Sequence, residues 1–413
     1  MEKPEISRRN LLKGGGAALA GMSILRVTMP EMAFGQSDEE VIPWIDRPES
    51  PPPGFDFNLQ PWENLVDSWL TPIDRFFTVY HYDQPQNLDE GSWRLDITGL
   101  VARPMSLTVA DLKARERREL DFTLECSGDN GFNWFTSAVA NGHWAGTPLA
   151  SVLEEAGVLE HGIEVVFYGV DSGTVTIRDN GGVLGPGQTG NVKDDGEGGL
   201  DLTITEQFAR SMSIRDAFHR DNLLCYELNG EPLAPVRGFP LRLIAPGWFG
   251  VANVKWLTRI EVRDQRYANR FMARDYVSIR EEQRAGQTVW TFSTVGPFRL
   301  KSAPGHVARR ANGHYAIKGA AWGAPIAAVQ VQIDDGPWLE AILERPAARN
   351  HRGYSWRFWR LNWDVPTRGE HTVRSRAIDI NGNIQPAPDD PFLSSKVTYW
   401  ESNGQITRRV RIP

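Results

Sequence analysis

The chain of 413 residues contains only 2 cysteines. This excludes a disulfide scaffold, a zinc site made of four cysteines and an iron–sulfur cluster held by four protein thiolates. No Cys-x-x-Cys-His sequence occurs, so we expect no covalent c-type haem in this chain. Basic residues are not in excess either, since 45 Lys and Arg stand against 52 Asp and Glu, a formal net charge of −7. Nucleic acid is therefore not the expected partner, because phosphate binding needs a basic surface.

Long apolar runs are also missing, apart from a short one near the start. A basic stretch at Ser7–Lys13 (SRRNLLK) precedes small and apolar residues from Gly14 to Leu25, and Ala33-Phe34-Gly35 follows. This order is typical of a twin-arginine export signal, so we interpret residues 1–35 as one, with a basic N-terminal helix as the alternative. Because that route carries folded proteins, we expect a periplasmic protein with a bound prosthetic group and no membrane span.

Glycine, proline and tryptophan are abundant instead, with 39, 27 and 15 residues, which indicates strands joined by many turns. Residues 36–59 contain the run PESPPPG and are typical of an extended arm or linker. Residues 60–284 alternate strand-like and helix-like segments and are expected to form a first domain. Residues 285–413 alternate apolar and polar positions, as in Val329–Ile333, between Asn-Gly and Asp-Gly turns, which predicts an antiparallel β-sandwich.

Local signals place several elements in the first domain. Thr108 with Asp111 predicts a helix start, and Thr147-Pro148 predicts the start of a helix over 149–155 that ends at Gly157. Short apolar strands are expected over 164–168, 223–228 and 240–244.

Two motif-like segments are poor candidates for binding sites. Gly185–Gly190 fits the G-x-G-x-x-G pattern of dinucleotide-binding loops, but no strand enters it directly and no helix follows. We therefore expect residues 180–199 to form a flexible loop near an active site. Asp379–Asn383 resembles the start of a calcium loop, yet Ile384 takes the position that requires glycine, which favours a turn.

Cys126 carries the strongest chemical signal. It follows a short apolar strand in FTLECSGDNG (residues 122–131) and precedes a glycine turn, so its thiol lies on a constrained loop. Three interpretations compete: a catalytic nucleophile, a disulfide with Cys225, or a thiolate ligand to a soft metal held mainly by a non-protein chelator. No partner histidine is evident for a nucleophile. Cys225 lies in an apolar strand and is typical of a small core residue.

Two cations fit the third interpretation. Arg242 lies in a strand before a turn, and Lys255 follows among apolar neighbours. An arginine and a lysine near a glycine turn can cradle an anion, such as the phosphate of an organic chelator. The alternative is that both are surface charges.

With these residues in place, the sequence resembles the sulfite oxidase family of molybdenum enzymes, which includes sulfite dehydrogenases and the molybdenum subunits of sulfane dehydrogenases. An ordered series of motifs across about residues 60–265 carries the resemblance. These are Leu124–Gly128 (LECSG), Trp144–Leu149 (WAGTPL), Tyr226–Leu233 (YELNGEPL), Gly238–Arg242 (GFPLR), Pro246–Gly250 (PGWFG) and Val254–Leu257 (VKWL). Ile317–Trp322 (IKGAAW) and Arg376–Asp379 (RAID) resemble the family's dimerisation domain.

The resemblance implies an α+β fold, in which a mixed α/β molybdopterin-binding domain precedes an immunoglobulin-like antiparallel β-sandwich. It implies that Cys126 is a ligand of molybdenum and that a pyranopterin dithiolene supplies two further sulfurs. Tyr276 matches the family's active-site tyrosine, and Arg237, at a position that is usually histidine, is the other catalytic candidate. The residues that match the family's cofactor contacts are His81, Asp171, Arg237, Arg242, Asn253, Val254 and Lys255.

Two departures from the family concern the substrate. Val79 stands where the sulfite oxidisers have an arginine beside the metal, and Ala252 occupies another of their cationic positions. An oxyanion needs compensating positive charge in a desolvated pocket. Arg237 and Arg274 are the residues that could supply some of that charge.

We therefore expect a periplasmic oxidoreductase with a molybdenum cofactor that oxidises sulfite or a related reduced sulfur compound by oxygen-atom transfer. Since the chain has no haem motif, its electrons are expected to pass to a separate c-type cytochrome, which the acidic surface would attract. A homodimer, or an assembly with a cytochrome subunit, is expected. The alternatives are a sulfoxide-type reductase with the same metal centre and a metal-free binding module built on the sandwich.

Overall fold

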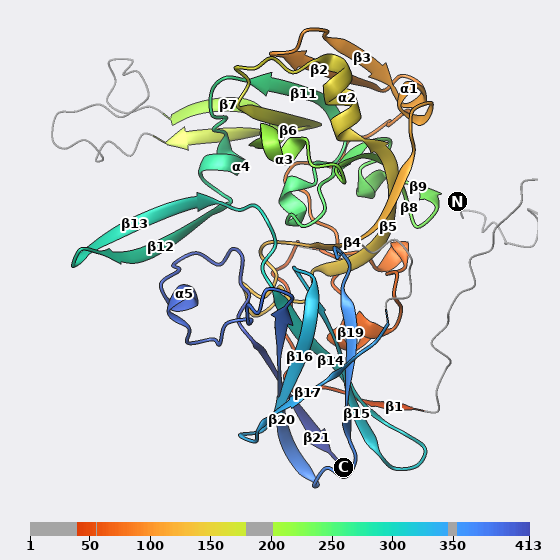
Figure 1. Cartoon of the computed structure of the whole chain (residues 1–413), viewed down its shortest axis with the longest axis vertical. Helices are drawn as coiled ribbons and strands as arrows, with labels where there is room; N and C mark the ends of the chain where they lie inside the picture. Colours follow the sequence, from red (N-terminus) through yellow and green to blue (C-terminus); the bar gives the residue numbers. More distant parts are fainter. Residues whose placement is uncertain (1–38, 55, 179–200, 346–352) are drawn as a thin grey trace, which may run out of the picture.

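The computed structural model describes residues 39–54, 56–178, 201–345 and 353–413. The predicted export signal and the whole predicted loop at 180–199, including Gly185–Gly190, lie outside these ranges. The described residues form two bodies stacked along the long axis of the molecule (Figure 1). None of the described helices is long and apolar enough to cross a bilayer.

The upper body contains two five-stranded sheets. The first has the order β3-β2-β11-β6-β7 and consists of β2 (Arg94–Gly99), β3 (Met105–Thr108), β6 (Glu164–Arg178), β7 (Asp201–Ser213) and β11 (Leu257–Arg263). The second has the order β10-β8-β5-β4, with β9 paired to β8, and consists of β4 (Arg118–Glu125), β5 (Val139–Pro148), β8 (Leu223–Leu228), β9 (Glu231–Pro232) and β10 (Arg242–Ile244). Among the described strands only β2 and β11 pair in parallel.

The helices of the chain are short. They are α1 (Val109–Lys113), α2 (Leu149–Ala156), α3 (Ile214–Ala217), α4 (Arg270–Ala273) and α5 (Pro391–Ser394), with 3-10 turns η1 (Trp62–Val66), η2 (Ile73–Arg75), η3 (Pro235–Arg237) and η4 (Gly250–Ala252). The predicted helix starts are confirmed: Thr108 and Asp111 form a reciprocal capping box, and α2 ends at Gly157, whose φ is 70°. The fold is therefore mostly sheet, with fewer helical residues than the predicted mixture implies.

The lower body is made of two antiparallel sheets. One has the order β1-β14-β15-β19-β18, formed by β1 (Glu40–Ile42), β14 (Lys301–Arg309), β15 (Tyr315–Trp322), β18 (Ile342–Leu343) and β19 (Arg357–Trp363). The other has the order β17-β16-β20-β21, formed by β16 (Ile326–Ile333), β17 (Trp338–Glu340), β20 (Gly369–Asp379) and β21 (Ile406–Ile412). Val307 and Ile317 of the first sheet share one buried core with Val331 and Val373 of the second, as the sheets of a sandwich do.

Several contacts cross the domain limits that composition predicts. Within the predicted linker, β1 pairs with β14, and Trp62 and Trp69 of the predicted first domain lie in the core of the sandwich. The expected boundary at residues 284 and 285 falls inside a hairpin formed by β12 (Val277–Arg284) and β13 (Gln287–Thr294). The turn at 285–286 has positive φ at both residues, 50° and 78°, so the change of pattern at this point coincides with a tight hairpin turn.

A buried ionic cluster joins the two bodies. Lys301, at the start of β14, forms an ion pair with Glu125 at the end of β4, and its Nζ lies 3.7 Å from Oδ2 of Asp129. The exposed fractions of Lys301, Glu125 and Asp129 are 1%, 0% and 1%. Trp322 of the sandwich donates its Nε1–H to Oε2 of Glu125 over 2.9 Å. Burial alone would lower the pKa of Lys301, but the two carboxylates outweigh it and raise that pKa, so the ammonium stays charged.

The cluster predicts a large loss of stability when its cation is removed. Lys301→Ala leaves two buried carboxylates without their partner, which costs about 3–5 kcal/mol. Chemical denaturation followed by fluorescence should show the apparent midpoint fall. The matched control is Lys318→Ala, because Lys318 is half-buried and pairs with Glu39 at 2.6 Å near the surface. That change should cost at most about 1 kcal/mol, and equal losses for the two variants would contradict the role of the cluster.

Candidate active site

One cavity gathers the predicted site residues. It encloses about 700 Å³ including its open mouth, and it lies in the upper body. Its walls come from segments far apart in the chain, namely residues 76–81, the end of β4, β6, the stretch 236–256 and Tyr276. The predicted residues that line it are His81, Cys126, Asp171, Arg237, Arg242, Asn253, Lys255 and Tyr276.

Val254 is the predicted residue that does not line the cavity. Its side chain is buried in the hydrophobic core, and its carbonyl accepts a hydrogen bond from the Leu243 N–H over 2.8 Å. The residue holds the strand next to the site, and its valine side chain has no contact to offer a cofactor. The family resemblance identified the segment that contains Val254. In the folded chain, the neighbours Asn253 and Lys255 line the cavity and Val254 packs into the core.

Cys126 follows the last residue of β4 and is held by its backbone. Its N–H donates to the Ala138 carbonyl over 2.9 Å, and its own carbonyl accepts from the Asp129 N–H over 3.0 Å. Asp129 Oδ1 in turn accepts from the Ala138 N–H over 2.8 Å. The side chain is 7% exposed, and burial raises the pKa of the Cys126 thiol to about 12. A neutral buried thiol is a poor nucleophile, whereas a soft metal ion binds and deprotonates it directly.

The disulfide interpretation is wrong. Both cysteines are free, and Cys225 is fully buried in β8 with its thiol directed to the Glu227 carbonyl. Its antiparallel partner across the sheet is Arg242 of β10. Cys225 is therefore the small core residue that its strand pattern predicted.

Three basic side chains, those of Arg237, Arg242 and Lys255, line the cavity. Arg242 donates to the carbonyls of Arg237 (2.9 Å) and Asn253 (3.0 Å), while Arg237 donates to those of Phe77 (2.5 Å) and Phe76 (2.7 Å). Lys255 Nζ donates to the Val236 carbonyl over 3.2 Å. Within the described residues none of the three cations forms an ion pair. Burial lowers the pKa of Arg237 and of Arg242 to about 10, and that of Lys255 well below its ordinary value.

The site is therefore short of negative charge. Nε of Arg237 and Nε of Arg242 are buried without a hydrogen-bond partner, and so is Oδ1 of Asp171. Burial raises the pKa of Asp171 to about 6, although Lys255 opposes this shift. Grouping buried cations without an anion is costly unless a ligand supplies one. A phosphorylated organic group with further donors for Asp171 fits these residues, because it would satisfy both the cations and the orphaned oxygen.

The side-chain amide of Asn253, which lines the cavity, is hydrogen-bonded within its own loop. Its Oδ1 accepts from the Ala245 N–H over 2.8 Å, and its Nδ2 donates to the carbonyls of Trp248 (3.2 Å) and Phe249 (3.0 Å). The amide is fully used in fixing the loop between β10 and η4. It positions the cavity wall, and only its backbone carbonyl reaches another site residue, Arg242.

A histidine–tyrosine pair lies at the other end of the cavity. His81 Nε2 and the Tyr276 hydroxyl are 2.5 Å apart. Burial, helped by the charge of Lys255, lowers the pKa of His81 to about 3, and burial raises the pKa of Tyr276 well above its ordinary value. Both groups are therefore neutral near pH 7. In a neutral pair the tautomer of His81 decides which group donates: Nε2 accepts from the hydroxyl when Nδ1 carries the proton, and Nε2–H donates to the phenol oxygen in the other tautomer.

Sequence reasoning missed the aromatic residues that hold this pair. Phe208 of β7 stacks on His81 with a centroid distance of 4.8 Å, and Trp400 stacks on Tyr276 at 4.2 Å. Trp400 belongs to the far end of the chain, so no local pattern links it to the site. Val79 lines the cavity, whereas Ala252 is buried outside it.

Arg274, named as a possible replacement charge, does not line the cavity. It is half-exposed and pairs with Asp275 Oδ1 at 3.0 Å. Of the two predicted replacements only Arg237 faces the cavity, and carbonyls hold both of its terminal nitrogens.

Two family models match the two bodies. Residues 81–271 match the oxidoreductase molybdopterin binding domain, and residues 301–400 match the Mo-co oxidoreductase dimerisation domain. The first range contains every predicted site residue except Tyr276, which lies a few residues beyond its end.

Curated relatives agree with these domains. Mitochondrial sulfite oxidase of Homo sapiens is 30% identical over 355 residues, which cover 80% of this chain and 60% of the relative. Sulfite oxidase of Gallus gallus is 28% identical over 85% of this chain and 74% of its own length. Nitrate reductase [NADH] 2 of Phaseolus vulgaris is 29% identical over 80% of this chain but only 38% of its own length. The chain thus spans about 60% of the length of the mitochondrial sulfite oxidases.

A solved structure shares the fold over nearly the whole chain. The sulfane dehydrogenase SoxCD from Paracoccus pantotrophus superposes with a TM-score of 0.67 over 97% of this chain and 96% of the matched chain, at 21% identity. The domain models, the curated relatives and this likeness agree with a cavity that suits a phosphorylated cofactor beside a single buried thiol. The chain belongs to the sulfite oxidase family of molybdopterin-binding oxidoreductases.

Proposed function

We propose that this chain is an exported molybdenum-cofactor oxidoreductase that oxidises sulfite or a related reduced sulfur compound and passes the electrons to an external c-type cytochrome. One observation carries the proposal: a single cavity contains the Cys126 thiol, the neutral His81–Tyr276 pair and the cluster of Arg237, Arg242 and Lys255. This combination supplies a metal ligand, a proton donor and an anchor for an anionic cofactor.

Different residues of the cavity would bind different parts of the cofactor. Cys126 is the proposed thiolate ligand of molybdenum. The cluster of Arg237, Arg242 and Lys255 would bind the phosphate of the pterin, and Asp171 would accept from a pterin N–H. When bound, the molybdenum centre supplies the oxygen-atom transfer and the two-electron change.

The remaining residues shape the reaction space. The Tyr276 hydroxyl has one proton: when it donates that proton to an oxygen of the substrate, the Nε2–H tautomer of neutral His81 would donate to the phenol oxygen and fix its direction. Phe208 stacks on His81 and Trp400 stacks on Tyr276, so both rings are held in place by aromatic contacts. A dry, preorganised donor of this kind favours charge that develops on oxygen.

A second candidate is the removal of oxygen from a sulfoxide by the same centre. It is favoured by Val79, which lines the cavity where the family's sulfite oxidisers have an arginine. Together with Phe208 and Leu124 it gives the lining an apolar part, which suits an uncharged sulfur compound better than a dianion.

Further features of the chain support the proposed location, electron acceptor, domain type and assembly. The predicted signal at residues 1–35 supports export to the periplasm, and the lack of a haem motif supports an external acceptor. The strand orders β14-β15-β19-β18 and β17-β16-β20-β21 correspond to A-B-E-D and C′-C-F-G, which supports an immunoglobulin-like sandwich. The match of residues 301–400 to a dimerisation domain supports a homodimer or a larger assembly.

If Cys126 is the metal ligand, its replacement should abolish activity without changing the fold. Cys126→Ser should abolish turnover and remove the thiolate–molybdenum absorption band, while circular dichroism and the unfolding midpoint stay close to those of the parent protein. The control is Cys225→Ala, which deletes a buried thiol outside the site and should cost only about 1 kcal/mol of stability with turnover retained. Full activity in Cys126→Ser would contradict the ligand assignment.

The direction of the reaction can be decided by paired assays. Holoenzyme with sulfite and ferricytochrome c should turn over, whereas methionine sulfoxide with a low-potential donor should not. Val79→Arg should raise kcat/KM for sulfite at least about tenfold, because it restores positive charge beside a dianion. Val365→Arg, in an exposed loop, is the matched control. Activity in the sulfoxide assay alone would replace the oxidase proposal by the reductase.

The pKa of His81 predicts its protonation state. Nitrogen NMR of histidine-labelled protein should show His81 neutral from pH 8 down to pH 5, since its pKa is lowered to about 3. His143 is the internal control, because its hydrogen bond to Asp121 raises its pKa above 6.5. The unfolded chain binds this proton more readily, so stability contributed by neutral His81 is lost as the pH falls from 6.5 toward 3. Titration of His81 near pH 6.5 would refute its buried, neutral state.

A further inference from the structure

A buried arginine lies behind the pair of His81 and Tyr276, outside the lining of the cavity. Arg210 of β7 is 1% exposed, and its two terminal nitrogens donate to the carbonyls of Phe271 and Val295. Its Nε is buried without a hydrogen-bond partner. Among the described residues no carboxylate forms an ion pair with this guanidinium. The side chain is therefore a fixed positive charge without a direct counter-charge.

The two carbonyls that hold Arg210 belong to residues in contact with the pair. The Phe271 ring meets the His81 ring edge-on at a centroid distance of 4.9 Å. The Val295 N–H donates to the Tyr276 carbonyl over 2.9 Å. A single residue thus separates the guanidinium from each member of the pair.

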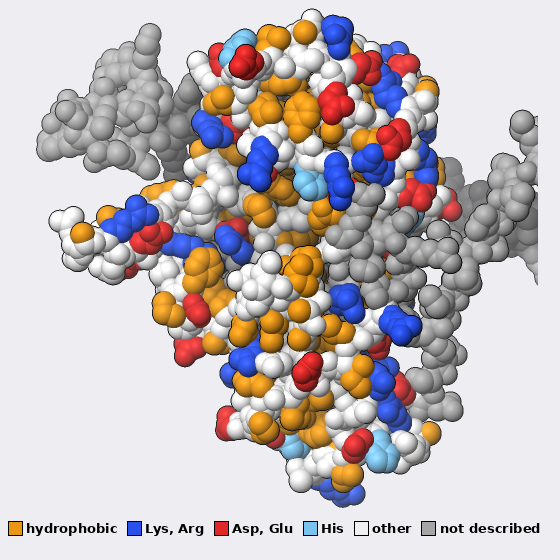
Figure 2. Space-filling model, viewed as in Figure 1, with side chains coloured by type: hydrophobic (Ala, Val, Ile, Leu, Met, Phe, Trp, Pro, Cys, Tyr) orange, Lys and Arg blue, Asp and Glu red, His pale blue; other side chains and the backbone are white. Residues whose placement is uncertain are grey.

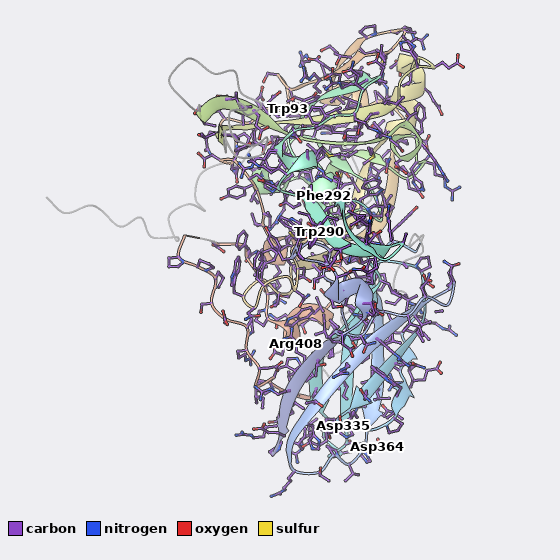
Figure 3. All side chains as sticks on the ribbon, turned by 90° about the vertical axis from the view of Figure 1, so that its left-hand side faces the viewer. Trp93, Trp290, Phe292, Asp335, Asp364 and Arg408 are labelled. Atoms are coloured by element: carbon purple, nitrogen blue, oxygen red, sulfur yellow. The ribbon has the colours of Figure 1, made fainter. Side chains whose placement is uncertain are left out.

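The strand and the hairpin that meet here fix the position of Arg210. Phe208, two positions earlier in β7 and so on the same face of the strand, stacks on His81. Figure 1 shows β7 and α4 beside the base of the β12–β13 hairpin. Val295 directly follows β13, the strand that carries the labelled Trp290 and Phe292 in Figure 3. The guanidinium therefore joins β7 to this base at the rear of the pair.

A buried guanidinium without a counter-charge is costly, because the charge loses its hydration. Burial lowers the pKa of Arg210 to about 10, although Tyr276 and Glu401 oppose the shift, so the group is still charged at pH 7. Cations at the surface do not carry this cost, since they lie in solvent and among acidic side chains (Figure 2). Neutral donors could hold two carbonyls as well, so the charge itself needs a reason.

The carboxylates near Arg210 and the pair are bound elsewhere. Asp275 forms an ion pair with Arg270, and Glu401 pairs with Arg299 at 3.5 Å. They therefore offset the charge of Arg210 only in part.

The charges that shift the pKa of His81 show the sign of the potential at the pair. Those of Lys255, Arg270 and Arg210 lower this pKa, and that of Asp275 raises it. Positive charge therefore predominates around the pair, although the pair itself is neutral.

We propose that Arg210 makes the substrate end of the cavity selective for an oxyanion, and that it does so without touching the ligand. Its charge acts on an oxygen that accepts the Tyr276 hydroxyl proton in a hydrogen bond, through a medium in which charges are felt farther than in water. It replaces in part the arginine that the family's sulfite oxidisers have at the position of Val79. The inference rests on the proposed function, since it concerns the ligand of the same cavity, and it favours sulfite over an uncharged sulfoxide.

Sulfate binding to the holoenzyme, measured by calorimetry at constant ionic strength, tests this charge without turnover. Arg210→Gln keeps a hydrogen-bond donor and removes the charge, so the Kd for sulfate should rise at least about fivefold. The Kd for dimethyl sulfoxide, which is uncharged, should stay the same. Arg210→Lys keeps the charge and should bind sulfate nearly as the parent protein does.

The matched control is Arg357→Gln in the sandwich. Arg357 also donates to a carbonyl, that of Glu344 over 3.0 Å, and its Nε is likewise buried without a partner. Its replacement should leave both Kd values unchanged. Tyr276→Phe locates the bound anion, because loss of the donor at this end should weaken sulfate binding. Unfolding midpoints check that every variant is folded.

The proposal is overturned if the wild-type holoenzyme does not bind sulfate or if Arg210→Gln binds it as tightly as the parent protein. Equal weakening for sulfate and dimethyl sulfoxide, or equal loss in Arg210→Lys and Arg210→Gln, would reduce Arg210 to a structural clamp. Unchanged sulfate binding in Tyr276→Phe would place the anion elsewhere and refute the proposal as well. Failure of the proposed function looks different, since the wild-type protein would then not oxidise sulfite while the sulfate comparison still reports on Arg210.

Discussion

The ion pair between Lys301 and Glu125 is the constraint on which the rest of the structure depends. Glu125 ends β4 and directly precedes the proposed metal ligand, while Lys301 begins the first long strand of the sandwich. A buried ammonium between two buried carboxylates tolerates little displacement, because each charge needs its partner in a medium of low dielectric constant. This ion pair fixes the position of Cys126 relative to the sandwich. The sandwich therefore supports the loop that carries Cys126.

The cavity shows a different arrangement. Arg237, Arg242 and Lys255 are held by backbone carbonyls, and none of them forms an ion pair with another residue in the part of the chain that the structure describes. Grouping buried cations in this way is costly unless a ligand supplies negative charge, so the cavity suits an anionic ligand. The molybdopterin of the family supplies such an anion, and the orphaned Oδ1 of Asp171 supplies an acceptor for its ring system.

The part of the site that meets the substrate differs from the part that holds the cofactor. Around His81 and Tyr276 the walls are aromatic and apolar, and Val79 takes the place of a family arginine. The family therefore determines the cofactor more firmly than it determines the substrate. The few polar groups at this end, a phenol and a neutral imidazole, suit the transfer of an oxygen atom with proton exchange and not the tight binding of a dianion.

The sequence by itself determined the features that depend on neighbours in the chain. The Thr108 cap, the end of α2 at Gly157, the strand that leads to Cys126 and the family motifs all follow from local propensity or from residue order. Only the tertiary structure decided that Trp400 stacks on Tyr276, that Lys301 lies beneath the Cys126 loop, and that the Asn253 amide turns into its own loop. The composition change at residue 285 likewise proved to be a hairpin turn. The first two contacts join residues more than a hundred positions apart, where side-chain packing and the need to satisfy buried polar groups decide the partner, and no local pattern records that choice.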